Sequence, residues 1–136
     1  MLKKLILCLF VLLLPVSALA DVVISEVCAL NGTYKNEHAY DWIELHNSGD
    51  KTVTLTGWHL SDSKKNPDKW TFPEGAKLKA GKYLTVWCTG EAGLDPGKGS
   101  EFCADFAISS SGENLVLSDP EGNLVQLRSE EHTSEL

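Results

Sequence analysis

Short runs in which apolar and polar residues alternate make up most of the chain, and this pattern strongly restricts its fold. In Tyr83–Cys88, every second residue from Leu84 onward can enter a core, while Tyr83, Thr85 and Trp87 face the other way. Turn residues separate such runs at intervals of about 8–12 residues, as in all-β sandwiches. Helical periodicity is nearly absent. The sequence therefore predicts an all-β fold, an antiparallel β-sandwich.

Several strands can be placed from this alternation and from the Gly, Pro, Asn and Asp residues between the runs. The segment Asp119–Asn123 is expected to be the turn of a hairpin. The expected strands are Val22–Leu30, Trp42–His46, Val53–Leu55, Trp58–Leu60, Lys69–Phe72, Tyr83–Cys88, Phe102–Ile108, one that contains Leu115 and Leu117, and Leu124–Leu127.

The first twenty residues have the three zones of a secretory signal peptide. Lys3 and Lys4 precede the apolar run Leu5–Leu14, and small residues lead to a cleavage site that we place between Ala20 and Asp21. The apolar run is shorter than the about 20 residues that a membrane-spanning helix needs. We therefore expect residues 1–20 to be removed and the mature protein to be secreted (extracellular, periplasmic or on the cell surface) without a membrane anchor.

The last nine residues, 128–136, break the apolar alternation abruptly. Their codons can be written so that they match the opening of an adapter used in short-read DNA sequencing. We therefore expect residues 128–136 to be foreign and the natural domain, residues 21–127, to be truncated. Those residues are enough for one domain with a single core.

The balance of charge restricts the possible partners. The chain has 12 basic and 19 acidic residues and a formal net charge of −7. Nucleic acids and anionic membranes attract clustered positive charge, so neither is an expected partner.

Three cysteines remain once Cys8 leaves with the signal peptide: Cys28, Cys88 and Cys103. An oxidising compartment permits one disulfide and leaves one thiol over, and the sequence alone does not choose among the pairings. Cys88 and Cys103 flank a glycine-rich loop, and closing about 15 residues would contribute roughly 3 kcal/mol in the chain-entropy model. We favour the Cys88–Cys103 disulfide. The three thiols have no C-x-x-C pair, so no metal and no cofactor is expected.

A series of short motifs resembles the lamin tail domain family over nearly all of residues 22–126. The motifs are Ile24-Ser25-Glu26, Asp41-Trp42-Ile43-Glu44-Leu45-His46-Asn47, Leu55-Thr56-Gly57-Trp58-His59-Leu60-Ser61-Asp62, Phe72-Pro73, Leu78-Lys79-Ala80-Gly81, Thr85-Val86-Trp87, and Phe106-Ala107-Ile108-Ser109 before Gly112-Glu113. The resemblance implies an immunoglobulin-like sandwich. It is closest to the secreted bacterial branch, in which the domain is an accessory found in front of CotH-like kinase domains.

Trp42, Trp58, Trp70 and Trp87 could form an aromatic platform that faces a glycan or peptide ligand, although a small domain also uses tryptophan in its core.

Glu26 and Glu44 could form a carboxylate pair, but no nucleophile or base converges with them. The histidines and loop carboxylates lack the spacing of known metal sites. They are His38, His46, His59, Asp41, Asp62 and Asp68. We predict no catalytic and no metal-binding residues.

Two functions are compatible with these features. The first is a non-enzymatic secreted module that attaches to a protein, a cell surface or a glycan. The second is the leading part of a larger secreted enzyme, a CotH-like kinase or a hydrolase, whose catalytic domain lies outside this sequence.

Overall fold

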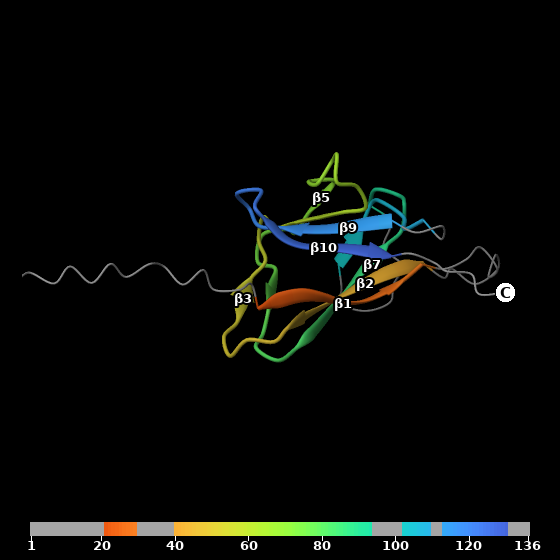
Figure 1. The fold of residues 1–136 in the computed structure, drawn as a ribbon. Coiled ribbons are helices and arrows are strands. Elements are labelled where there is room, and N and C mark those ends of the chain that lie inside the picture. The colour runs from red at the N-terminus through yellow and green to blue at the C-terminus, as the bar shows by residue number, and fades with distance from the viewer. Residues whose placement is uncertain (1–20, 30–39, 94–101, 110–112, 131–136) are drawn as a thin grey trace, which may run out of the picture.

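The computed structural model describes residues 21–29, 40–93, 102–109 and 113–130, and these residues contain ten strands and no helix. Two four-stranded sheets lie face to face (Figure 1), which confirms the predicted immunoglobulin-like sandwich. The first, the β2 sheet, has the order β1 (Val22–Cys28), β2 (Asp41–Asn47), β7 (Tyr83–Cys88) and β8 (Phe102–Ala104). The second, the β9 sheet, has the order β10 (Leu124–Glu130), β9 (Glu113–Ser118), β4 (His59–Ser61) and β5 (Trp70–Thr71).

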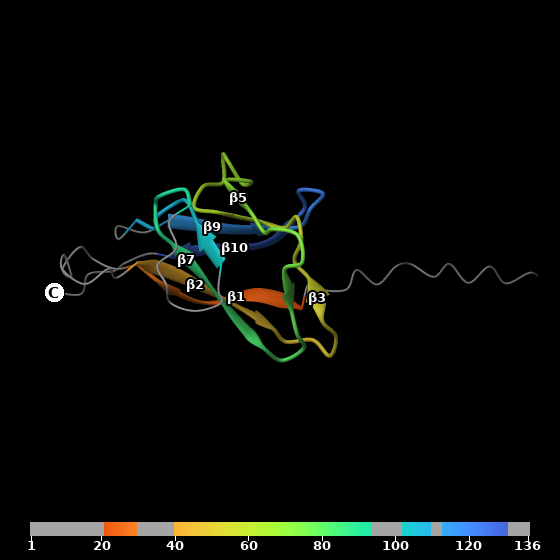
Figure 2. The ribbon, with the colours of Figure 1, turned by 180° about the vertical axis from the view of Figure 1, so that it is seen from behind.

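A small third sheet pairs β3 (Val53–Thr54) with β6 (Lys77–Leu78). It lies at one end of the sandwich, seen from both sides in Figures 1 and 2. All pairs are antiparallel except β7 and β8, which run parallel.

The core fills the space between the inner faces of the two large sheets. Burial alternates residue by residue along β2, where Ile43 and Leu45 have no exposed surface. Leu60, Leu115 and Leu117 meet them from the β9 sheet. Alternation in the sequence thus becomes two layers because each strand has one apolar row to bury.

The two long sides of the sandwich are closed by different chemistry. Where β1 lies beside β10, the Gln126 side chain accepts a hydrogen bond from Ile24 N at 2.6 Å, and Arg128 donates one to Ile24 O at 3.1 Å. On the side of β5 and β8, the rings of Trp70, Phe72 and Phe102 pack edge to face or tilted. Side chains therefore satisfy the backbone at one side, and aromatic packing seals the other.

A bulge in β1 sets which of its residues face the core. Both Ser25 and Glu26 lie opposite Glu44, and the pairing shifts by one residue between Ile24 and Glu26. Without this shift, strict alternation would turn Val27 away from the core, but Val27 packs against the core.

The structure differs from the predicted strands in a few places. β1 ends at Cys28, and Leu30 lies outside the described residues. The segment after β8 is irregular, although Phe106 and Ile108 are buried. Ile108 N donates its hydrogen bond to the Asp41 carboxylate at 2.7 Å, and not to a neighbouring strand. Strand β6 was not predicted, since its residues resemble a turn. β10 continues to Glu130, beyond the predicted domain end at Leu127.

The predicted Cys88–Cys103 disulfide is not present: Cys28, Cys88 and Cys103 all carry thiols. Register explains why. Cys103 lies opposite Trp87, whereas Cys88 lies opposite Ala104, so the two cysteines point to opposite faces of the β2 sheet. Cys28 lies three strand intervals from Cys103, about 14 Å at 4.8 Å per interval, and disulfides need Cα atoms within about 7 Å.

We predict that reductant does not change the stability of this domain. Protein purified without reductant from an exporting host should unfold at the same temperature, within about 2 °C, before and after treatment with dithiothreitol. After denaturation the mature chain should react with one thiol reagent at each of Cys28, Cys88 and Cys103. Fewer reactive thiols, restored by reductant, would show that a disulfide forms despite this register.

Candidate functional site

The outer face of the β2 sheet carries a row of four side chains that runs across all its strands. Directly opposite residues share a face, and the register joins Cys28 to Trp42, Trp42 to Trp87, and Trp87 to Cys103. Both tryptophans are half-buried, and neither belongs to the core or packs against it. The two indoles therefore lie side by side on the outside of the sandwich.

A second aromatic row lies toward the other end of the same face. Here the register places Val23, His46 and Tyr83 opposite one another. The rings of His46 and Tyr83 stack with centroids 4.2 Å apart and planes 14° from parallel. Tyr83 is 61% exposed and Val23 is 37% exposed, so this row presents apolar surface to solvent.

Polar side chains fill the space between the two rows. Glu26, Glu44 and Thr85 lie opposite one another across β1, β2 and β7. The Ser25 hydroxyl donates a hydrogen bond to Glu44 Oε1 at 2.7 Å. The two glutamates that could form a carboxylate pair therefore lie opposite each other. We name the three rows together the outer face.

Sequence reasoning proposed four ligand-facing tryptophans, and the structure separates them. Trp42 and Trp87 lie on the outer face, while Trp58 and Trp70 pack against the core. Trp87 Nε1 is buried and has no hydrogen-bond partner among the described residues. Tyr83 was not named as a site residue, although its position in the alternation of β7 already placed it on the same face as Trp87.

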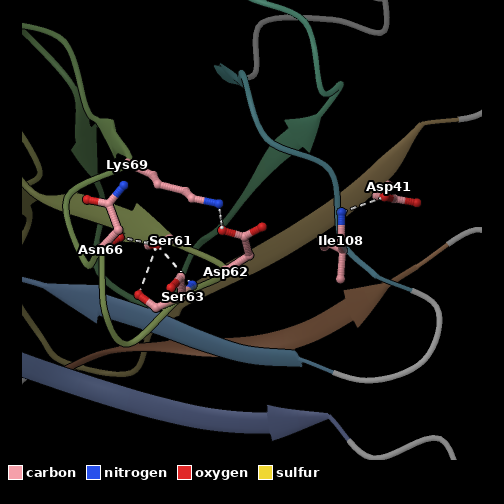
Figure 3. Close-up of polar contacts among 7 residues, drawn as sticks. All are labelled: Asp41, Ser61, Asp62, Ser63, Asn66, Lys69 and Ile108. Atoms are coloured by element: carbon pink, nitrogen blue, oxygen red, sulfur yellow. Dashed lines mark hydrogen bonds and ion pairs between the residues drawn. The ribbon is translucent and has the colours of Figure 1, made fainter.

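Structural roles account for Ser61 and for two of the candidate loop carboxylates, Asp62 and Asp41. Ser61 donates to Asn66 O at 2.6 Å and accepts from Ser63 N at 3.0 Å, which fixes the loop after β4 (Figure 3). Asp62 and Lys69 form an ion pair across this loop at 2.5 Å. Asp41, at the start of β2, is buried, and its carboxylate accepts the hydrogen bond from Ile108 N (Figure 3).

The histidines do not converge. His46 stacks on Tyr83, and His59 shares a hydrogen bond with Thr71 at 2.8 Å. His38 lies outside the described residues. In the part of the chain that the structure describes, no three His, Cys, Asp or Glu side chains are grouped as metal ligands would be.

Cys28 is the thiol at the β1 end of the tryptophan row. Burial, and then the nearby carboxylates of Asp41 and Glu26, raise the pKa of Cys28 above its usual value. A raised pKa keeps the thiol protonated at neutral pH, so Cys28 is a weak nucleophile and a weak metal ligand.

Two hollows lie away from the outer face. One, of about 270 Å³, is lined by Lys64, Pro67, Val116, Ser118, Gly122, Leu124 and Leu127 on the β9 sheet and its loops. The other, of about 450 Å³, is lined by Asp62, Lys69, Gly90, Asp105, Phe106 and Ala107. Two of its three charged lining residues, Asp62 and Lys69, are paired with each other, and Asp105 is the third.

A two-layer sandwich of mostly antiparallel sheets defines an immunoglobulin-like module, and this one carries aromatic side chains on one outer sheet face. The chain matches the Lamin Tail Domain family over residues 15–132 and belongs to that family. The family consists of non-catalytic immunoglobulin-like modules. No curated protein sequence matches the chain. Among the described residues, no helix has the length and hydropathy to cross a membrane.

Proposed function

We propose that this chain is a secreted attachment module that binds its partner through the outer face. The observation that carries the proposal is the Trp42–Trp87 pair, which lies outside the core on neighbouring strands. Burying an aromatic side chain of this size contributes roughly 1.5–3 kcal/mol, and here that gain is only partly used in folding. Tryptophan and tyrosine are the residues that most often dominate binding at interfaces.

Sedimentation with insoluble bacterial cell envelope tests the proposal. The exported chain, beginning at Asp21, is expected to pellet with the envelope, because the outer face supplies the contact. The double variant Trp42→Leu/Trp87→Leu should weaken this binding at least about tenfold, since it keeps apolar bulk but removes both ring faces.

Leu124→Ala is the matched control. Leu124 is 61% exposed but belongs to the β9 sheet, so its truncation should leave envelope binding unchanged. Equal binding by the tryptophan variant and the parent protein would refute the outer face as the attachment surface.

The finer assignment within the family is also part of this proposal. The signal peptide supports export, and the motifs around Asp41–Glu44 and Lys69–Pro73 support the bacterial branch that precedes CotH-like kinase domains. In such a protein the module would attach a catalytic domain to its site of action. Sequencing the gene with long reads through the codon of Leu127 tests this: a stop codon soon after the last strand would exclude the enzyme-linked form.

A further inference from the structure

Building on the proposed attachment function, we infer that the partner of the outer face is a polysaccharide whose sugars carry free amino groups. Three properties of the outer face support this: the pairing of its central strands, its charge and the spacing of its two aromatic rows.

The middle of the outer face offers no free strand edge. β2 pairs with both β1 and β7, and the half of β7 that carries Val86–Cys88 pairs with both β2 and β8. An extended peptide that binds by strand addition needs an unpaired edge, which β2 and the Val86–Cys88 half of β7 lack. The two hollows described above lie elsewhere on the described part of the chain. Sugar rings, in contrast, have flat C–H faces that pack on indole and phenol rings.

The negative charge of the outer face favours sugars that carry a positive charge. Glu26 and Glu44 lie directly opposite each other, an arrangement of like charges that destabilises a sheet. No lysine or arginine belongs to the three rows. The Ser25 hydroxyl occupies one Glu44 oxygen, and the other carboxylate oxygens of the pair accept no hydrogen bond from the described residues.

A ligand ammonium group would relieve this repulsion and form charge-assisted hydrogen bonds with the two carboxylates. An acidic polysaccharide would be repelled both by this pair and by the net charge of −7.

The spacing of the rows suits a chain molecule. Trp42 and His46 are four residues apart on β2, about 14 Å at 3.4 Å per residue, and Glu44 lies midway. A sugar chain that runs along the strands would stack on the tryptophan row and on the exposed Tyr83 ring. Its central amino group would then lie over the carboxylates, where a cation near the aromatic faces is further stabilised.

Calorimetric titration of the purified chain with glucosamine oligomers tests the inference. The matched probe is the N-acetylated oligomer of the same length, which keeps the ring faces and removes the charge. The amino form is expected to bind about tenfold more tightly, which corresponds to one charge-assisted contact. Glu26→Gln/Glu44→Gln should abolish this preference and leave the affinity for the acetylated form unchanged.

Matched variants keep the result interpretable. Glu74→Gln/Glu121→Gln makes the same change in charge at exposed turns and should retain the preference. Trp42→Leu and Trp87→Leu, made singly as well as together, should weaken binding of both oligomers, and thermal unfolding will show that each variant is folded.

Three outcomes would overturn the inference. They are no binding of either oligomer by the folded protein, a preference that survives Glu26→Gln/Glu44→Gln, or equally tight binding of oligolysine through the same residues. The last result would assign a basic peptide instead. If the oligomers fail while the tryptophan variant still loses envelope binding, only the ligand class is wrong; if envelope binding also survives, the attachment function itself fails.

Discussion

Replacing Asn47 with alanine is expected to lower the free energy of unfolding by about 3–4 kcal/mol. Asn47 ends β2 and has no exposed surface. Its amide Nδ2 donates to Lys51 O at 2.8 Å and to Leu78 O at 2.9 Å, and its Oδ1 accepts from Gly49 N at 3.0 Å. One side chain thus satisfies backbone groups of the turn after β2 and of strand β6, and alanine would leave all three groups without that partner.

Equilibrium urea unfolding provides the measurement, with a lower midpoint and an unchanged slope as the expected result. The backbone bonds of Asn47 to Lys82 O and Gly81 N do not involve the side chain, so the variant isolates the amide.

Asn123→Ala is the matched control for this prediction. Asn123 donates to Asp119 Oδ2 at 2.9 Å in the exposed β9–β10 turn, and this bond is the main reason that the pKa of Asp119 is lowered. Because water replaces an exposed partner, the midpoint should shift little. Equal losses in the two variants would show that burial is not the cause.

The fold could be predicted because its main determinant is local. Alternation along Tyr83–Cys88 gives both the bounds of β7 and the face on which each residue lies, and the structure has the same bounds. Asn47 follows directly after the predicted strand Trp42–His46, and nothing in the local pattern marked it as buried. Its role depends on the carbonyl of Leu78, thirty-one residues away, and no local pattern specifies that contact.

The outer face could be predicted in part for the same reason. Alternation separates Trp87 from the core residue Val86, but it does not say which residue on the next strand lies opposite. The Cys88–Cys103 prediction was wrong because it used loop length, whereas the parallel register of β7 and β8 decides which thiols share a face. The bulge at Ser25 likewise changes which face of the sheet the following residues of β1 point to, and no clear pattern in the sequence marks it.

The second large effect is expected from Phe72→Ala, which should cost about 3–5 kcal/mol. Phe72 is 1% exposed and is the largest fully buried side chain of the described residues. The centroid of its ring lies 4.6 Å from that of Trp70 and 5.5 Å from that of Phe102, and both pairs pack edge to face. Since β5 and β8 are short and lie at the ends of their sheets, this aromatic cluster is the main contact that closes their side of the sandwich.

Two further variants separate packing from the mere loss of a ring. Phe72→Leu refills most of the volume and should recover more than half of the loss, whereas Tyr83→Ala removes an aromatic ring that is 61% exposed and should cost under about 1 kcal/mol. Urea midpoints measure stability, and near-ultraviolet circular dichroism reports the packing of Trp70 beside the cavity. If Phe72→Ala matched Tyr83→Ala in stability, the sandwich would be held closed at the β1 and β10 side alone, through Gln126 and Arg128.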